Sequence, residues 1–518
     1  MDDTFRKSMA WVHTWIGLFL GWFAFLIFFT GSLSVFHDEL NYWARPSLHG
    51  KAPVSRLEAL QAGEAFLQEH APDSRMWRIA YPNERYPALV VSWEDAKGAT
   101  KDAIIDPRSG TVDRLETEGG SFFVRMHFRL HMNRSTLPVG IWIVVAASMA
   151  MLLACISGVV IHSRILKDLF LFRPRAGKQR RWLDAHNLLG VLPLPFYLLI
   201  TFTGLVAYYY VYLPAPIHAL YKGGEEEFRS DVVSLQYREY KPDNPPGRPA
   251  QNYPLAKLIE CTEAVFGPDS TNYFFVRDPG RDNATVEVWR RRNDGIKQQV
   301  YRIAYDGVTG KTLRVFTKRS PILETQSFLS GLHFAEFGGS ALRWLYVIAG
   351  MMGAAVIATG TELFIIKRKN KAASDRSRAA YEMIERVNVA MVAGLAVASA
   401  AFMCGMRLLP ASLADRKWWE VFVFLAVWLA SFVHAVIRPL PRLWREQLAA
   451  GALAAALVPV TAFVTPQLAL YRTVVTGDWV TAAVDAVFLL WAGLLAVLAV
   501  KVKWQPVRGA AARKGEIG

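Results

Sequence analysis

Eight apolar stretches, each long enough to cross a lipid bilayer as a helix, dominate this chain of 518 residues. About 20 apolar residues in a helix span the hydrocarbon core of a bilayer, which is roughly 30 Å thick. Helices suit this environment because they satisfy their backbone polar groups within one segment. The sequence therefore predicts a polytopic α-helical membrane protein with about eight transmembrane helices. The stretches cover residues 11–36, 138–161, 188–213, 341–366, 387–409, 421–437, 448–464 and 480–500.

The net charge of +15 is distributed unevenly along the chain. Basic residues gather beside alternate apolar stretches, before the first and after the second, fourth, sixth and eighth. Lys and Arg are enriched in cytoplasmic segments, so both termini are expected in the cytoplasm. Anionic membrane lipid is the expected partner of this charge, and nucleic acid is not. The first stretch is too long for a cleaved signal peptide, so we expect it to be retained.

Two long polar segments, 37–137 and 214–340, then fall on the periplasmic side of a bacterial inner membrane. Each begins with an amphipathic pattern, at 56–70 or 255–266, and continues with short extended runs and a glycine turn. We therefore expect two separate periplasmic α+β domains. The remaining boundaries are membrane segments at 1–36, 138–162, 188–213 and 341–366, basic loops at 163–187 and 367–386, a four-helix block at 387–501 and a tail at 502–518.

The N-terminal four-helix core is predicted to be an internal duplication. HTWIG begins at His13 and HNLLG begins at His186, and in both cases a Thr-Gly pair ends 18 residues after the histidine. RLH ends at His131 and GLH ends at His333, and in both cases a Ser-Gly or Thr-Gly pair ends 27 residues later. Two independent matches without a gap make a chance similarity an unsatisfactory explanation.

These four histidines are candidate ligands of haem iron, because ionisable residues at membrane depth are functional candidates. Two imidazoles on neighbouring helices at one depth suit the two axial positions of a haem. The predicted pairs are His13 with His186 near the cytoplasmic face and His131 with His333 near the outer face. A single histidine at a helix end is more often an interfacial residue than a ligand, so the hypothesis depends on the repeat.

Glycines one turn after two of these histidines, Gly17 and Gly190, would leave room for a flat macrocycle. Glycine pairs also allow close helix packing without any ligand. His127 and His162 are alternative ligands, for His131 and for the cytoplasmic pair respectively. The chain contains three cysteines and no Cys-x-x-Cys-His motif, so any haem is expected to be of the non-covalent b type.

Motifs around the repeated histidines resemble those of the PepSY-associated transmembrane family, also described as iron-regulated or siderophore-reductase-like membrane proteins. The likeness covers about residues 5–370 and comprises WVHTWIGLFLGW with FTGSL, RLHMN with ISGVV, WLDAHNLLG with FTGLVAYYY, and GLHFAEFGG with ATGTEL. The resemblance implies two periplasmic PepSY domains over a four-helix core. It further implies two b-type haems, held at the positions of His13, His186, His131 and His333, and the reduction of ferric siderophores to release Fe(II).

The predicted function is therefore that of a haem-dependent ferric-siderophore reductase that needs no acid-base catalyst. No glycine-rich dinucleotide fingerprint follows a strand on the cytoplasmic side, so a membrane quinol or a separate protein is the expected electron donor. The role of the last four helices stays open. Two other classes of protein are alternatives, a transporter of iron-siderophore or haem and a haem-free membrane regulator with PepSY sensing domains.

Overall fold

The structure is a computed structural model that divides into two compact units. The helical unit comprises Met1–Pro46, Glu116–Thr201 and Leu345–Gly518, and the sheet unit comprises Ser47–Leu115 and Phe202–Trp344. The structure describes residues 3–51, 53–132, 138–162, 173, 175–228, 247–290, 295–298, 301–317, 321–369, 371–372, 374–465 and 468–502. Residues 163–172 and 174 of the predicted basic loop, and all of the predicted tail after residue 502, lie outside the described residues.

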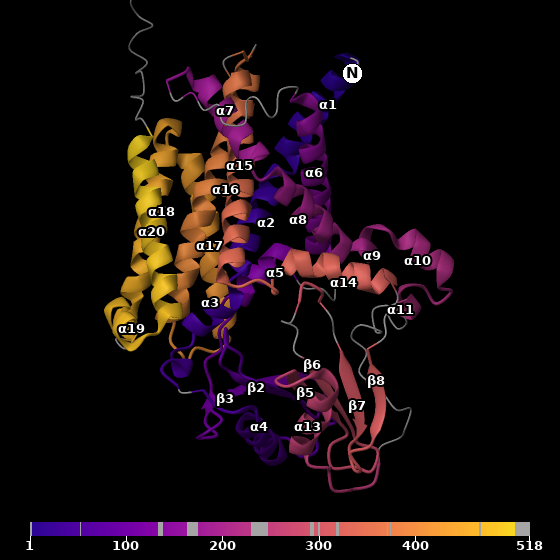
Figure 1. The fold of residues 1–518 in the computed structure, drawn as a ribbon. Coiled ribbons are helices and arrows are strands. Elements are labelled where there is room, and N and C mark those ends of the chain that lie inside the picture. The colour runs from indigo at the N-terminus through magenta and orange to yellow at the C-terminus, as the bar shows by residue number, and fades with distance from the viewer. Residues whose placement is uncertain are drawn as a thin grey trace, which may run out of the picture. The chain divides into compact units, whose positions relative to one another are not determined.

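Long apolar helices make up most of the helical unit (Figure 1). In the described part of the chain, six helices are long and apolar enough to cross a membrane, and the number rises to eight if each of two bent pairs is one span. The chain is thus a multi-pass membrane protein. The helices are α1 (Asp3–Phe19), α2 (Gly21–Ser34), α3 (His37–Trp43), α5 (Ser121–Arg129), α6 (Val139–Ile161), α7 (Lys178–Val191), α8 (Leu194–Ala207), α15 (Ser340–Lys369), α16 (Asp375–Leu408), α17 (Arg416–Ile437), α18 (Leu440–Val460), α19 (Leu470–Thr476) and α20 (Trp479–Lys501).

The first and third predicted spans are each broken into two helices. α1 and α2 meet at Leu20 with a bend of 64°, and α7 and α8 are bent by 60°. Pro193 explains the second break, because proline lacks an N–H and clashes with the preceding turn of a helix. Gly17 and Gly21 flank the first break, where the absence of side chains lowers the energetic cost of a bend. The expectation of two continuous helices was wrong at these places.

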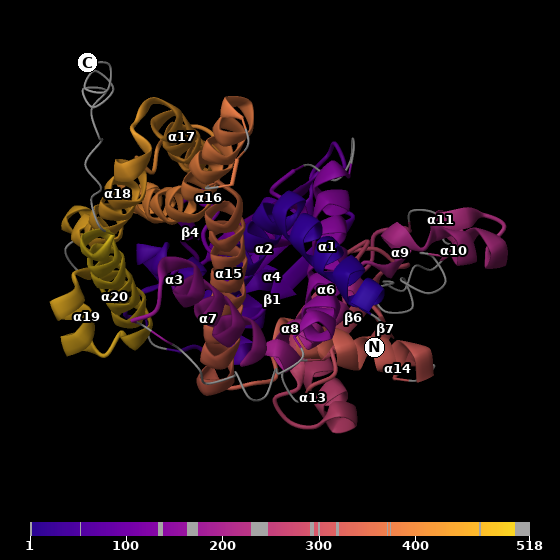
Figure 2. The same cartoon turned by 90° about the horizontal axis from the view of Figure 1, so that it is seen from above.

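The last helices form a separate group within the helical unit (Figure 2). α16 packs against α17 and α18, and α18 packs against α20. These helices cover the predicted block at 387–501, and α16 begins before it, at Asp375, where Ser374 forms a capping box with Ser377. Small buried residues such as Ala390 and Ala393 allow these helices to approach closely.

The sheet unit contains one antiparallel sheet of eight strands, so the expectation of two separate α+β domains was wrong. The first four strands come from one half of the duplication and the last four from the other. β1 and β5 pair directly, with Ile79 opposite Phe274. This pairing removes two edges that separate four-stranded sheets would leave open. The order is β4 (Val112–Asp113), β3 (Thr100–Ile105), β2 (Leu89–Glu94), β1 (Met76–Ala80), β5 (Thr271–Arg277), β6 (Thr285–Arg290), β7 (Arg302–Asp306) and β8 (Thr312–Phe316).

Two helices share one hydrophobic core with this sheet. They are α4 (Arg56–His70) and α13 (Leu255–Phe266), and both match the predicted ranges. Leu67 of α4 and Leu258 of α13 are fully buried in the core, together with strand residues from both halves. The unit also contains η1 (Pro46–Leu48), α9 (Tyr209–Tyr212), α10 (Pro214–Leu220), α11 (Gly224–Phe228) and α14 (Pro321–Phe334), and η3 (Thr461–Val464) belongs to the helical unit.

Candidate functional site

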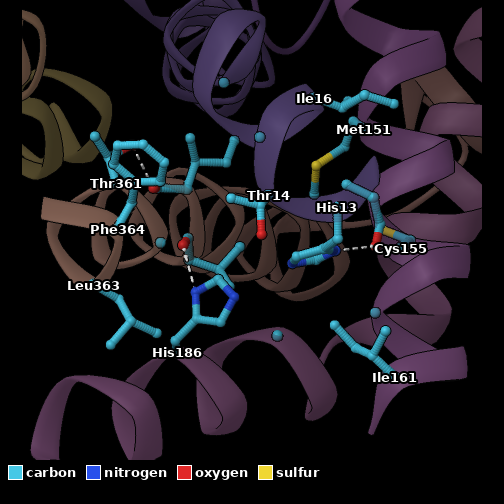
Figure 3. Close-up of a pocket in the computed structure, with 18 of the residues that line it drawn as sticks. His13, Thr14, Ile16, Met151, Cys155, Ile161, His186, Thr361, Leu363 and Phe364 are labelled. Atoms are coloured by element: carbon cyan, nitrogen blue, oxygen red, sulfur yellow. Dashed lines mark hydrogen bonds between the residues drawn. The ribbon is translucent and has the colours of Figure 1, made fainter. Parts of the chain in front are cut away.

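A largely apolar cavity of about 370 Å³ lies inside the helical unit. Its walls come from α1, α2, α6, α7, α8 and α15, including residues on both sides of each helix break. His13 and His186 both line it, and Figure 3 shows the two rings turned toward each other across the cavity. Two of the predicted ligands are therefore brought together, and the bends in the first and third spans contribute to the space between them.

Each of these histidines is anchored through one ring nitrogen to a neighbouring helix. His13 Nδ1 lies 2.9 Å from the carbonyl oxygen of Ala154 and 3.2 Å from Ser157 Oγ on α6. His186 Nδ1 lies 2.9 Å from the carbonyl oxygen of Val356 and 3.3 Å from Thr359 Oγ1 on α15. The two arrangements are equivalent, as the duplication predicts.

The anchoring determines which ring nitrogen is free to bind a metal. A carbonyl oxygen only accepts hydrogen bonds, so Nδ1 of each ring carries the proton and donates it. Nε2 then has an unshared electron pair, and this is the arrangement found in most histidines that bind metals. In Figure 3, the nitrogen without a hydrogen bond in each ring lies on the side that faces the other ring.

The spacing of the two rings fits an iron atom between them. Their centroids are 6.2 Å apart and their planes are inclined by 79°. Two imidazole–metal bonds of about 2.0 Å, plus about 1.1 Å from each nitrogen to the centre of its ring, separate the centroids by about 6 Å. The described residues contain no group of three or more His, Cys, Asp or Glu that could hold a metal ion. A pair of histidines alone suits a metal that brings its own equatorial ligands, as haem does.

The cavity also has a cationic end. Lys367 and Arg368, in the last turn of α15, line it, and Arg368 stacks over the ring of Phe364 at 4.2 Å. Neither cation has an ion pair with a carboxylate among the residues that the structure describes. An apolar cavity with two cations at one end complements a ligand that is apolar over most of its surface and carries carboxylates at one edge. The residues present therefore fit haem.

Comparison with known proteins agrees with the motifs. The sequence model of the PepSY-associated TM region matches residues 10–367, which is more than two thirds of the chain. The chain belongs to this family. It is also 27% identical over 310 residues to the uncharacterised protein PA4219 of Pseudomonas aeruginosa, and the alignment covers 56% of this chain and 74% of that protein. The resemblance expected over residues 5–370 is confirmed, and α16 to α20 lie outside the PepSY-associated TM region.

A second set of histidines within the PepSY-associated TM region repeats the same local contact. His127 Nδ1, on α5, lies 2.8 Å from the carbonyl oxygen of Ile27 on α2. His333 Nδ1, on α14, lies 3.1 Å from Thr203 Oγ1 on α8. His127 packs against Gly31 and His333 against Gly204.

A single rule describes all four contacts. Each histidine ring lies against the glycine of a Ser-Gly or Thr-Gly pair: His13 against Gly158, His186 against Gly360, His127 against Gly31 and His333 against Gly204. His127 belongs to the helical unit and His333 to the sheet unit, and each contact lies within its own unit. Each Ser-Gly or Thr-Gly pair therefore provides a surface against which a histidine ring packs.

His131, the ligand first predicted for the outer pair, lies in a different environment. It follows the end of α5, and its Nε2 lies 3.2 Å from the carboxylate of Glu118. Its ring also approaches the indole of Trp418, with centroids 5.7 Å apart. The structure thus places His131 against a carboxylate and His127 against a glycine.

A sequence signal for His127 exists, although spacing alone overlooks it. FFVRMHF, which contains His127, and FLSGLHF, which contains His333, both have a His-Phe pair with phenylalanine five residues before the histidine. Aligning these motifs requires four additional residues after His127, so the ungapped spacing of 27 selected His131 instead.

The other predicted residues are partly associated with the cavity. Gly17 lines it, and a Cβ atom there would have no neighbour within 4 Å. Gly190 also lines it, but a Cβ atom there would lie 3.3 Å from the side chain of Val356. His162, the residue after α6, is part of the cavity wall. Gly17 therefore leaves space in the cavity, whereas Gly190 allows close packing of α7 on α15.

Proposed function

We propose that this protein is a b-type di-haem reductase of the bacterial inner membrane, which passes electrons outward to ferric siderophores in the periplasm. The observation that supports this most directly is the pair His13 and His186, whose rings are 6.2 Å apart and are both anchored through Nδ1. Membership of the PepSY-associated TM region family is compatible with this function.

His13 and His186 would hold one haem through Nε2. The open space beside Gly17 would accommodate part of the macrocycle, and Lys367 and Arg368 would pair with its two propionates. These roles follow from the shape and charge of the cavity.

For the second haem we propose His127 in place of His131 as a ligand, and we keep His333 as the other expected ligand. This assignment is supported by the local environment that they share with the first pair, in which Nδ1 is hydrogen-bonded and the ring contacts a glycine. Under this proposal His131 is not an axial ligand.

In the proposed reaction, the main role of the protein is to hold the two haems in place. A haem bound at each pair supplies a reversible one-electron couple. The chain keeps Nδ1 of His13 and of His186 protonated, fixes the planes of these two imidazoles and surrounds the inner site with apolar side chains. Oxygen donors of a siderophore bind the hard Fe(III) ion and hold Fe(II) much less well. The transfer of one electron to the ferric siderophore therefore favours release of the iron as Fe(II).

The direction of transfer follows from the proposed topology, with both termini in the cytoplasm and the sheet unit in the periplasm. The electron donor would be a membrane quinol or a separate protein. This part of the proposal is supported by the sequence, which contains no dinucleotide fingerprint after a strand on the cytoplasmic side.

A haem-to-protein ratio and a reduced-minus-oxidised visible spectrum of the purified protein test the proposal. We expect a b-type signal from about two haems per chain, and loss of one haem from His13→Ala and from His186→Ala. His434→Ala is a suitable control, because His434 pairs with Glu446 in the C-terminal helices. A chain without any b-type signal would reject the reductase and leave the transporter and the regulator as the remaining hypotheses.

A further inference from the structure

The C-terminal helices contact the rest of the helical unit through a buried ion pair at the start of α17. Arg416 and Glu420 form this pair, and their side chains are 1% and 0% exposed. Arg416 Nη1 donates to the carbonyl oxygen of Glu116 at 2.9 Å. Glu420 Oε2 accepts from the backbone N–H of Glu118 at 2.7 Å and from the hydroxyl of Thr117 at 3.0 Å. One residue pair of α17 therefore fixes the backbone of residues 116–118.

The segment held in this way is attached to α5, the helix that carries His127. The carboxylate of Glu118 forms an ion pair with Arg125 of α5 and lies 3.2 Å from His131 Nε2, just beyond the end of α5. Arg125 is two residues before His127. Side chains on both sides of His127 are thus held by Glu118, and Glu118 is itself held by Glu420.

Aromatic packing makes a second connection between the same helices. The ring of Phe122 stacks on Phe402 of α16 with centroids 4.1 Å apart, and it meets Phe424 of α17 at 4.8 Å. Phe123 also contacts Phe402, at 5.6 Å. Phe122, Phe402 and Phe424 are fully buried. The aromatic contacts therefore join α5 directly to α16 and α17, and the polar contacts join it to α17 through residues 116–118.

We propose that the C-terminal helices position the outer haem ligand. In this inference, which rests on the proposed function, Arg416, Glu420 and Phe402 are positioning residues that set the orientation of α5 and hence of the His127 imidazole. This gives α16 and α17, which lie outside the PepSY-associated TM region, a role at one haem. His131 acts with them as a partner of Glu118 and is not a ligand.

The physical basis is the cost of breaking a buried network. Replacing Glu420 with alanine leaves the Arg416 guanidinium without its ion-pair partner and removes the acceptor for two hydrogen bonds, so the 116–118 backbone must move. α5 follows through Arg125. The inner pair, His13 and His186, is anchored separately, through hydrogen bonds to Ala154 on α6 and Val356 on α15.

The test isolates one haem at a time in the full-length protein. In a His186→Ala background only the outer haem is expected to remain, and in a His333→Ala background only the inner haem. Glu420→Ala is added to each background, and the electron paramagnetic resonance spectrum and midpoint potential of the ferric haem are recorded. Both quantities respond to the relative orientation of the two axial imidazoles, which is what a positioning residue controls.

The matched control is Glu446→Ala, because Glu446 forms an ion pair with Arg438 beyond the other end of α17. Phe402→Leu is a milder second variant that keeps the polar network. We expect Glu420→Ala and Phe402→Leu to change the signal of the outer haem only, with Phe402→Leu giving the smaller change. Glu446→Ala should change neither haem.

Two outcomes would overturn the inference while the proposed function stands. In one, both variants leave the outer haem's spectrum and potential unchanged. In the other, both haems change together, which would indicate a general loss of structure. If the parent protein contains no haem, the proposed function fails, and that result is separate from either of these.

Discussion

The two histidine pairs differ in how closely their glycines approach the rings. In the His13–His186 pair, a Cβ atom added at Gly158 or Gly360 would lie 3.4 Å or 3.0 Å from the nearest ring atom. In the other pair, the corresponding distances at Gly31 and Gly204 are 2.7 Å and 2.9 Å. Distances below 3.0 Å leave no room for a methyl group. The comparison indicates that the same contact between a glycine and a histidine ring occurs at four places, and that it is tightest at Gly31 and loosest at Gly158.

The chain after the histidine also differs between the two halves of the duplication. After His127, Leu130 and His131 both adopt a positive φ, 53° and 55°, and the side chain of His131 turns to Glu118. After His333, only Ala335 has a positive φ, 54°, and α15 begins shortly afterward, at Ser340. In the first half, His131 therefore makes an additional contact with Glu118, the residue that Glu420 of the C-terminal helices holds.

Removing His127 and His131 separately tests which of the two histidines is a haem ligand. We expect His127→Ala to lose one haem, and we expect the same of His333→Ala, because in each variant a proposed haem ligand is removed. His131→Ala should retain both haems and change only the spectrum of the outer one, since Glu118 keeps its contact with Arg125. The haem-to-protein ratio measured on purified variants decides between them. Retention of both haems by His127→Ala and loss of one by His131→Ala would restore the pairing first predicted from spacing.

The sheet unit allows a second comparison between the two halves of the duplication, because their strands form one sheet. Leu67 of α4 and Leu258 of α13 are both fully buried in the same core. Replacing either with alanine should destabilise the unit by about 2–5 kcal/mol. Because β1 and β5 pair, we expect either substitution to increase backbone hydrogen exchange in the strands of both halves.

Leu313→Ala on β8 is the control for these variants, since the side chain of Leu313 is 41% exposed. It should have little effect on exchange elsewhere in the sheet. Faster exchange confined to the half that carries the substitution would show that the two halves unfold independently.

Local patterns in the sequence predicted more of this molecule than spacing or domain counting did. Amphipathic periodicity located α4 and α13 to the residue, because the burial of one face is a local property. The pairing of Ile79 with Phe274 joins strands almost 200 residues apart, and no local pattern encodes it. At the site, the internal repeat supplied long-range information that local patterns lack. His13 and His186 were predicted together, whereas the role of Glu420 depends on contacts between segments about 300 residues apart in the chain.

Replacing the glycines that contact the histidine rings tests whether the closeness of this contact matters for haem binding. Gly31 and Gly158 both lie within helices, α2 and α6, so alanine at either position should favour the helix by about 1 kcal/mol. Gly158→Ala brings a methyl group only into contact with His13, and we expect haem content to stay near that of the parent. Gly31→Ala forces the His127 ring to move, and we expect the affinity for the outer haem to fall about 10–100-fold, as happens when the surroundings of a metal ligand are disturbed. Haem titration of the apoprotein measures the affinities, and thermal unfolding without haem measures the helix effect. Gly158→Ala should therefore stabilise the apoprotein, whereas at Gly31 the steric clash with His127 opposes the helix effect, and only Gly31→Ala should weaken haem binding. Equal loss of haem from both variants would mean that the difference between 2.7 Å and 3.4 Å has no functional consequence.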